Sequence, residues 1–453
     1  MATRTDILAD ESRHRICAVE NAERRIARNT LLLVAKQAVS IFAEALALGL
    51  VMRALGAEGY GVYTAAFGVM GVVFLLSGTL NEVFCRFLSF EFGKGERGDA
   101  PAAFASVALL AVFFVAVALL LGETAGLWFV RTRLLVPDGF SVSSVRAYHA
   151  LLLSTSVGIL SLPFSAYVMA TERMGFVARM GFLSSGLSVG VALVLHGFAQ
   201  ESRLIAFAGL EIACVAIVLA AYAVKCRGIL LDAIRARGVM GRLRSTAAYF
   251  LWSSFRSAAN AVRFQGTQLY GNAHCGIAFN SAWGAAMKAG GWLIAPAMCF
   301  RDAYTPRIVK LRAEGDERRF CALVVRCCAL SALVFLVFAG PVFAFAPQLG
   351  AAWLGPAMPT EFVPFVRWTL VYYLFDALHT PLHVAIAADE RITGYQVTVS
   401  LIMAAGLGFA VLALFRGFPP SSAVAGVAFG NFLSFLYRAV YLRVMIRRRT
   451  WHS

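Results

Sequence analysis

Polar and charged side chains recur at helical spacing inside long apolar stretches of this 453-residue sequence. Residues 246–269 carry Arg256, Asn260 and Arg263, and spacings of four and three place them on one face of a helix. Two arginines seven residues apart form a cationic stripe about 10 Å long. Because a planar guanidinium binds phosphate or carboxylate through two donors, this stripe predicts an anion site.

Other apolar stretches carry cations at depths where a charge costs at least about 2.5 kcal/mol in hydrocarbon. Residues 276–300 contain Asn280 and Lys288 at helical spacing, and residues 29–52 contain Lys36. These groups extend the predicted anion site across further helices. The predicted substrate-binding residues are Lys36, Arg256, Asn260, Arg263, Asn280 and Lys288.

Acidic and imidazole groups in the same stretches are candidates for binding a coupling proton or sodium ion. Tyr372, Asp376, His379 and His383 share one helical face. Intramembrane His and Asp more often serve helix packing or proton handling than metal binding, so no metal site is predicted. The predicted ion-coupling residues are Glu44, Glu211, Asp376 and His379.

An alternative interpretation pairs Arg256 or Arg263 with Glu44, Glu211 or Asp376 in ion pairs that lock helices together. Buried charges usually have such partners. The deep cations Lys36, Arg256, Arg263 and Lys288 slightly outnumber the nearby deep acids, which favours a cationic cavity. Both interpretations stay open at this point.

The elements that must position these residues are transmembrane helices. Mean hydropathy is +0.73 and 60% of the residues are hydrophobic, well above a soluble domain. A helical span needs about 20 mostly apolar residues. The sequence predicts twelve spans, at 29–52, 61–84, 102–121, 148–170, 174–197, 203–225, 246–269, 276–300, 321–344, 363–387, 392–415 and 421–443.

Lys and Arg gather on alternate connections between these spans, giving a net charge of +16. They cluster before the first span, after the sixth and eighth, and in the tail, whereas the loop 345–362 has none. Because positive loops stay in the cytoplasm, both termini are predicted to face inward in a multi-pass protein. The charge thus indicates topology and contact with anionic membrane lipids, and nucleic acid is not a predicted partner.

The sequence carries no catalytic or nucleotide-binding signature. It lacks G-x-x-x-x-G-K-[ST], H-E-x-x-H and nucleophile-elbow motifs, and its loops are too short for a catalytic domain. The first span is too long for a cleavable signal peptide. The nine cysteines lie mostly in or beside apolar spans and predict neither a disulfide framework nor zinc. A non-enzymatic transporter without a cofactor, driven by H⁺ or Na⁺, is the prediction.

Two segments of the chain repeat one pattern. Pro163 stands nine residues before Glu172-Arg173, as Pro381 does before Glu390-Arg391, each at the end of a fourth span. A weaker echo joins Gly61-Val62-Tyr63 to Gly276-Ile277-Ala278-Phe279. The repeat therefore predicts two six-helix lobes that have the same orientation in the membrane and are related by a pseudo-two-fold axis along the membrane normal. The predicted segments are a basic N-terminus 1–28, lobes 29–225 and 246–443, a basic linker 226–245 and a basic tail 444–453.

A series of short motifs runs through the predicted spans and their connections. They are Asn29-Thr30-Leu31, Leu55-Gly56, Tyr60-Gly61-Val62-Tyr63, Arg86-Phe87-Leu88-Ser89-Phe90-Glu91, Gly93-Lys94-Gly95, Glu172-Arg173-Met174-Gly175-Phe176, Pro306, Ile308, Ala313, Gly315-Asp316 and Trp353-Leu354-Gly355. Together these motifs resemble the bacterial polysaccharide or O-antigen repeat-unit flippases, in the superfamily that includes the multidrug and toxin extrusion exporters. The resemblance runs over about residues 29–443, and the chain has Cys85 where that family commonly has glutamine.

The resemblance implies an all-α membrane protein in which two lobes form a V around a hydrated cationic cavity. It implies translocation of polyprenyl-pyrophosphate-linked oligosaccharide across the bacterial inner membrane, for surface polysaccharide such as O-antigen, capsule or exopolysaccharide. A polysaccharide polymerase and chain-length machinery are the implied protein partners. The main alternative is an ion-coupled multidrug or organic-cation exporter of the same fold, which would need an acid-dominated cavity.

Overall fold

Long helices account for nearly all of the described chain. The computed structural model describes the backbone of residues 4–95, 98–388 and 393–450. Side chains are described over 35–446, apart from those two gaps and Trp252, Phe255, Arg256, Pro306, Ala313 and Thr393. The helices are α1 (Arg4–Gly93), α2 (Ala100–Leu121), α3 (Leu127–Thr132), α4 (Ser141–Ala170), α5 (Met174–Val194), α6 (Arg203–Lys225), α7 (Arg227–Ile234), α8 (Val239–Cys275), α9 (Ile277–Glu314), α10 (Glu317–Ala344), α11 (Ala346–Leu354), α12 (Phe362–Ala387), α13 (Thr393–Phe415) and α14 (Ser422–Thr450).

The first two predicted spans lie in α1, on either side of a break at Gly56. This glycine has φ 73° and ψ 170°, a region that only glycine enters readily. Gly276, with φ 72° and ψ −162°, separates α8 from α9 in the same way. The sequence echo had matched Gly276 with Gly61, but Gly61 lies inside the helix, and the conformational counterpart of Gly276 is Gly56.

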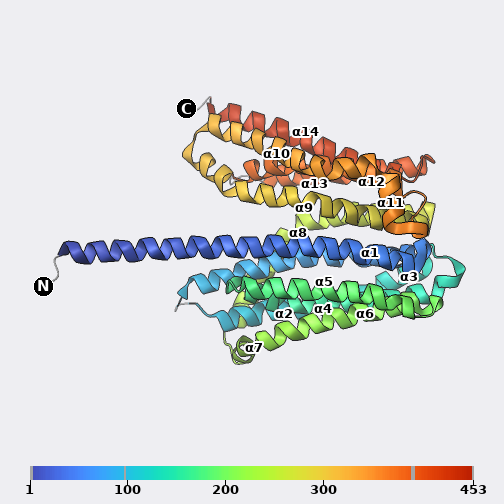
Figure 1. Cartoon of the computed structure of the whole chain (residues 1–453), viewed down its shortest axis with the longest axis horizontal. Coiled ribbons are helices and arrows are strands. Elements are labelled where there is room, and N and C mark those ends of the chain that lie inside the picture. Colours follow the sequence, from blue (N-terminus) through green and yellow to red (C-terminus); the bar gives the residue numbers. More distant parts are fainter. Residues whose placement is uncertain (1–3, 96–97, 389–392, 451–453) are drawn as a thin grey trace.

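The helices form two groups with α1 and α8 between them (Figure 1). In the N-terminal group, α4 packs against α1, α2 and α6, and α5 packs against α1. In the C-terminal group, α12 packs against α9, α10 and α14, and α13 packs against α14. Helix α8 contacts both α1 and α13, and therefore joins the two groups.

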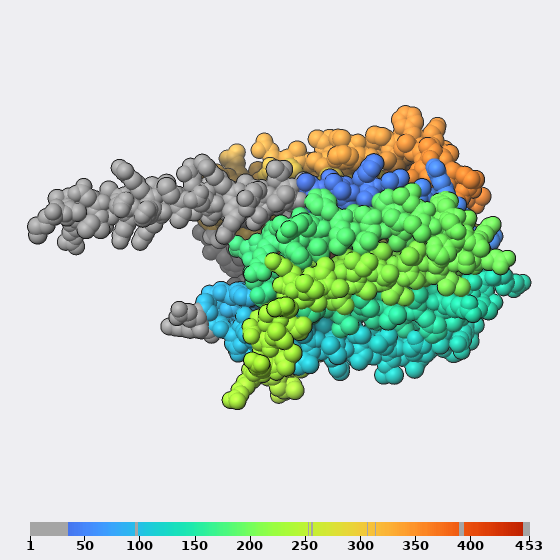
Figure 2. Space-filling view, turned by 60° about the horizontal axis from the view of Figure 1, so that its bottom comes forward, coloured from blue at the N-terminus to red at the C-terminus, as the bar shows by residue number. Residues whose placement is uncertain are grey.

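Eight helical segments of the described chain are long and apolar enough to cross a membrane, and one of them, Ala35–Gly93, covers both predicted spans of α1. The predicted spans 246–269, 276–300 and 363–387 also lie in helices, but α8, α9 and α12 are not among these eight. Helices α5 and α6 cover one outer face (Figure 2), where Leu193, Ile217 and Val224 expose apolar side chains. Such a face suits contact with lipid.

Both chain ends lie at one end of the molecule, together with α7, whereas α3 and α11 lie at the opposite end (Figure 1). The basic linker predicted at 226–245 is itself largely helical, because it contains α7 and the first residues of α8. Basic residues of this linker thus lie at the same end as the termini. The loop without Lys or Arg, 345–362, contains α11 and lies at the other end.

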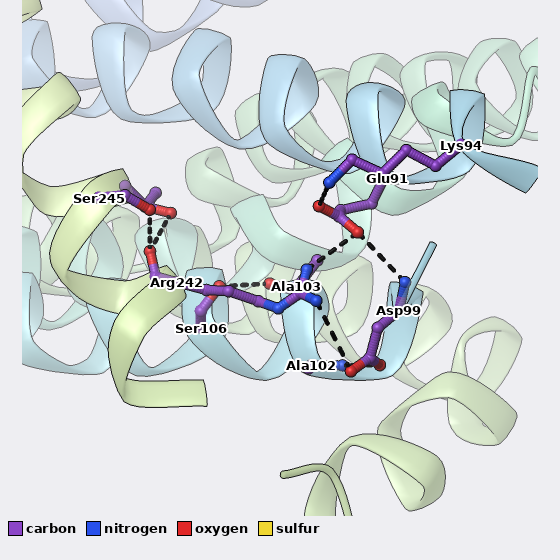
Figure 3. A network of polar contacts seen from close by, with 9 residues as sticks. Glu91, Lys94, Asp99, Ala102, Ala103, Ser106, Arg242 and Ser245 are labelled. Carbon is purple, nitrogen blue, oxygen red and sulfur yellow. Dashed lines mark hydrogen bonds and ion pairs between the residues drawn. The ribbon is translucent and has the colours of Figure 1, made fainter. Parts of the chain in front are cut away.

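A polar network ties α8 to α1 and α2 at the end that carries the termini (Figure 3). Glu91, which is largely buried, accepts from Lys94 Nζ at 2.5 Å and from the backbone N–H of Asp99 at 3.1 Å. Arg242 of α8 lies 2.9 Å from the second oxygen of the same carboxylate, which Lys94 does not contact. Asp99 in turn accepts from the backbone N–H of Ala102 at the start of α2. The start of α8 is thereby fixed to the N-terminal group.

A second tie joins α1 to α11 at the opposite end. Arg53 donates to the carbonyl oxygens of Ala352 and Trp353 at 2.7 and 3.0 Å. The Trp353 indole N–H donates to the carbonyl of Ala45 at 2.8 Å. Gly49 permits this approach, because a Cβ there would lie 2.9 Å from the Trp353 ring nitrogen. The two helix groups are therefore closed against each other at this end.

Candidate anion-binding cavity

A cavity of about 360 Å³ lies between α8, α9, α12, α13 and α14. Helix α12 presents Tyr372, Asp376, His379 and His383 to it, which is the face that helical spacing had singled out. Helix α8 contributes Asn260 and Arg263 from the predicted stripe. The structure thus brings two separately predicted clusters, more than a hundred residues apart in the sequence, to one site.

Arg263 is the central cation of this cavity, with only 1% of its surface exposed. Its guanidinium donates to Asn431 Oδ1 at 3.1 Å, to Asn260 Oδ1 at 2.7 Å and to the Tyr372 hydroxyl at 3.2 Å. All three partners are neutral. Among the described residues no carboxylate lies within 4.0 Å of Arg263, and its Nε–H is buried without a partner. For Arg263, the described structure therefore does not contain the alternative ion pair with Glu44, Glu211 or Asp376, whereas the side chain of Arg256 lies outside the described residues.

Helix packing holds Arg263 in this position. Asn260 precedes it by three residues on α8, so the two side chains share a helical face. Asn431 of α14 also donates to the carbonyl of Tyr372 at 3.2 Å, which fixes α14 against α12. The guanidinium carbon lies 4.8 Å and 5.4 Å from the ring centroids of Phe264 and Tyr372. These contacts orient the cation by hydrogen bonds and ring faces while leaving its charge without an ion-pair partner.

A chain of polar contacts runs from Asp376 across the cavity wall. The Asp376 carboxylate lies 3.1 Å from His379 Nε2, and His379 Nδ1 contacts the guanidinium of Arg438. Arg438 Nε donates to the Tyr395 hydroxyl at 2.9 Å, and that hydroxyl lies 3.0 Å from His383 Nδ1. These contacts join α12, α13 and α14 along the cavity wall, although the approach of Asp376 to His379 Nε2 does not have hydrogen-bond geometry.

The described charges of the cavity wall are mainly positive. Arg263, Arg301 and Arg438 line it, against the single described carboxylate of Asp376. Arg301 is ion-paired with Asp302 at 2.5 Å. Arg263 and Arg438 are buried, with 1% and 5% of their surfaces exposed. A cavity with this balance is suited to an anion.

Sequence reasoning missed Asn431, Arg438 and Tyr395. Asn431 and Arg438 are seven residues apart inside the last predicted span, the spacing that had marked Arg256 and Arg263. That pattern could have identified them, but neither residue was singled out within the last predicted span. Of the predicted stripe, the backbone of Arg256 lies in α8, and its side chain lies outside the described residues. No group of three or more His, Cys, Asp or Glu residues in the described chain could hold a metal ion.

The remaining predicted residues lie away from this cavity. Glu44 of α1 accepts from the indole N–H of Trp292 on α9 at 2.9 Å, and so links the two helix groups. Lys288, one turn before Trp292, acts electrostatically on Glu211 of α6. The stem of Lys36 lies against Gly181 of α5, where an added Cβ would meet Lys36 Cε at 2.3 Å. Glu44, Lys288 and Glu211 therefore lie where the two groups meet, whereas Lys36 lies between α1 and α5.

Asn280 occupies a third place, beside the break between α8 and α9. It is fully buried, and its Oδ1 accepts from Asn272 Nδ2 at 3.0 Å. Its carbonyl accepts from the hydroxyl of Thr64 on α1 at 3.0 Å. The described contacts of Asn280 are thus helix-joining contacts, although its Nδ2 has no partner.

Comparison with known proteins identifies the fold. No protein-family model matches the sequence, and no curated protein matches it. Solved structures of MATE family transporters of the MOP superfamily do match. An inward-facing one has a TM-score of 0.72 and 14% identity, covering 92% of this chain and 96% of its own. An outward-facing one has a TM-score of 0.64 and 13% identity, covering 94% and 96%.

A third similar structure is a MOP superfamily transporter from Pyrococcus furiosus, whose binding pocket is described as having reverse polarity, suggesting a different function. Its TM-score is 0.64 at 13% identity, and the match covers 92% of this chain and 95% of that one. At such low identities the likeness establishes the fold alone. The chain has the all-helical fold of the MATE transporters.

Proposed function

We propose that this protein is a flippase that carries polyprenyl-pyrophosphate-linked oligosaccharide repeat units across the bacterial inner membrane by alternating access. The observation that carries the proposal is Arg263, a buried arginine that lines a cavity, is held by neutral partners and lacks a described carboxylate within ion-pair distance. A buried charge without a counter-ion is costly, and a pyrophosphate would supply one.

The volume of the cavity limits the size of the ligand that it can bind. At about 360 Å³ it is near the lower end of ligand pockets, so it suits a pyrophosphate or a single sugar rather than a whole repeat unit. In the proposed mechanism the glycan occupies the space that opens between the helix groups. The polyprenyl tail stays in the lipid, where its apolar carbons need no protein cover.

Alternating access is supported by the way the two groups meet. They are closed at the α11 end through Arg53 and Trp353, contacts that a rocking motion must break. The fold also resembles both an inward-facing and an outward-facing MATE structure. Rocking of one bundle against the other around a fixed site is the general scheme for such repeats.

Ion coupling and cellular context belong to the same proposal. Asp376 and His379 are the coupling groups nearest to the anion site, and Glu44 and Glu211 bind an ion at the junction of the groups. The basic end of the molecule faces the cytoplasm, by the retention of positive charge. The lipid-linked units would then reach a polysaccharide polymerase with its chain-length machinery at the outer leaflet.

The decisive experiment measures export in a strain that lacks the gene. Intact gene, Arg263→Gln, and the Arg256→Ala/Arg263→Ala double variant are compared by mass spectrometry of lipid-linked repeat units in each leaflet. We expect both variants to reduce outer-leaflet units by about a hundredfold, since a lost charge-assisted pair costs about 2–3 kcal/mol or more.

Arg367→Gln is the matched control. Arg367 lies on α12 outside the cavity, is exposed, and donates to the carbonyl of Phe343. It should export normally at equal membrane abundance. Normal export by the double variant would contradict the proposed role of the cationic cavity.

A cation or drug exporter of the same fold is the second candidate, favoured by the multidrug resistance function named for the similar inward- and outward-facing structures. It predicts that expression confers resistance to toxic organic cations. It also predicts that lipid-linked units remain normal when the gene is deleted. Resistance that depends on Asp376 but not on Arg263 would favour this candidate.

A further inference from the structure

Asp376 occupies an unusual position for a carboxylate in an anion-binding cavity. Its side chain is 21% exposed and lies in the electrostatic field of Arg263 and Arg438, which come from two different helices. Although no carboxylate lies within 4.0 Å of Arg263 among the described residues, Asp376 is the described carboxylate that lines the same cavity. The described titratable and charged groups around it are Arg263 of α8, Arg301 of α9, Tyr372, His379 and His383 of α12, Tyr395 of α13 and Arg438 of α14.

An anion bound at Arg263 would compete with Asp376 for the same positive charges. Two like charges about 6 Å apart at an effective dielectric constant of about 20 repel strongly enough to weaken binding about a hundredfold. The repulsion disappears if the carboxylate becomes neutral. Asp376 lines the cavity and its side chain is 21% exposed, so a proton from solvent can reach the carboxylate directly.

We propose that the cavity binds a phosphate-type dianion together with one proton, which Asp376 takes up when the anion occupies Arg263. This inference rests on the proposed anion site and adds what accompanies the anion. The proton comes from solvent in the cavity and forms an O–H bond directly on the Asp376 carboxylate. When the anion leaves, that bond breaks and the proton returns to water by the same route.

The test uses the purified full-length protein in detergent and inorganic sulfate as the probe. Sulfate resembles the phosphate group but keeps its double charge from about pH 6 to about pH 8, so the probe itself takes up no proton. Titration calorimetry in two buffers of different ionisation enthalpy counts the protons taken up for each sulfate bound. We expect about one proton per sulfate, and affinity that rises as the pH falls.

Asp376→Asn mimics the neutral carboxylate. It should bind sulfate about tenfold to a hundredfold more tightly at about pH 8, with no proton uptake and a flat pH profile. Glu361→Gln is the matched control, because Glu361 caps the same helix about 20 Å away. It should behave as the wild type in both affinity and proton count.

Three outcomes would overturn the proposal: sulfate binding to the wild type without proton uptake, proton uptake that persists in Asp376→Asn, or no sulfate binding at all. The wild-type count tests the proposal even if the variant does not fold. Failure of the proposed function looks different. If the protein binds sulfate with proton uptake but does not move lipid-linked glycan, the proton-coupled anion site is supported and only the proposed substrate is wrong.

Discussion

Helices α4 and α12 are built on the same plan but carry different chemistry. Each contains a proline, Pro163 or Pro381, and each ends seven or six residues later, at Ala170 or Ala387. Aligned on the proline, the cavity-lining residues of α12 have small counterparts on α4. The pairs are Tyr372 with Ser154, Asp376 with Gly158, His379 with Ser161, and His383 with Ser165.

The small side chains of α4 allow close helix packing, whereas the large polar ones of α12 border a cavity. A Cβ on Gly158 would meet Val215 of α6 at 3.8 Å, so α4 faces an apolar neighbour there. At the matching place on α12, Asp376 faces arginines from α8 and α14. In a repeated fold, one copy of a helix can therefore serve helix packing while the other copy lines a cavity with polar side chains.

The strongest test of this difference between α4 and α12 is to place on α4 the carboxylate that α12 carries. We expect Gly158→Asp to destabilise the protein by about 2.5–3.5 kcal/mol, because an unpaired carboxylate would face apolar side chains inside the bundle. Thermal unfolding in detergent measures the loss. Gly158→Ala is the control and should be neutral or slightly stabilising, since its methyl group would make an ordinary van der Waals contact with Val215 at 3.8 Å and alanine favours helix. Equal stability of the two variants would refute the assignment of α4 to packing.

The helix breaks at Gly56 and Gly276 test whether the two copies share the same backbone conformation at this place. Neither Gly56 nor Gly276 has an atom within 4 Å of an added Cβ, so alanine there costs only backbone strain. We expect Gly56→Ala and Gly276→Ala each to lower the unfolding free energy by about 1–3 kcal/mol, and by similar amounts. Gly190→Ala, in the middle of α5 with open space around it, is the control. A cost at only one of the two breaks would contradict their equivalence.

The smallest expected effect concerns the aromatic residue after each repeated Glu-Arg pair, Phe176 in one copy and Tyr395 in the other. The hydroxyl of Tyr395 joins Arg438 and His383, and Tyr395→Phe would give the C-terminal copy the residue of the other. We expect export to fall about fivefold to tenfold, because the two lost hydrogen bonds are worth about 0.5 kcal/mol or slightly more each. Tyr437→Phe removes a hydroxyl from a ring that stacks on Tyr395 and should leave export unchanged. A larger loss from Tyr437→Phe than from Tyr395→Phe would contradict the role assigned to the Tyr395 hydroxyl.

Most of the helices and part of the site could be predicted from the sequence. Hydropathy and charge located the long apolar helices, and helical spacing grouped Asn260 with Arg263 and Asp376 with His379. These are local properties, because the residues concerned lie within two turns of each other on one helix. The polar helices α8, α9 and α12 gave the weakest hydropathy signal, since their side chains line a cavity or join helices rather than contact lipid.

The sequence by itself determined an all-helical chain, its basic and non-basic ends, and the polar faces of α8 and α12. Only the tertiary structure decided that these two faces share a cavity with Arg438, while Glu44, Glu211 and Lys288 lie at the junction of the groups and Lys36 lies against α5. It also decided that Gly56, not Gly61, matches Gly276. The physical reason is that spacing along one helix fixes which residues share a face, but the rotation and packing of distant helices fix which faces meet.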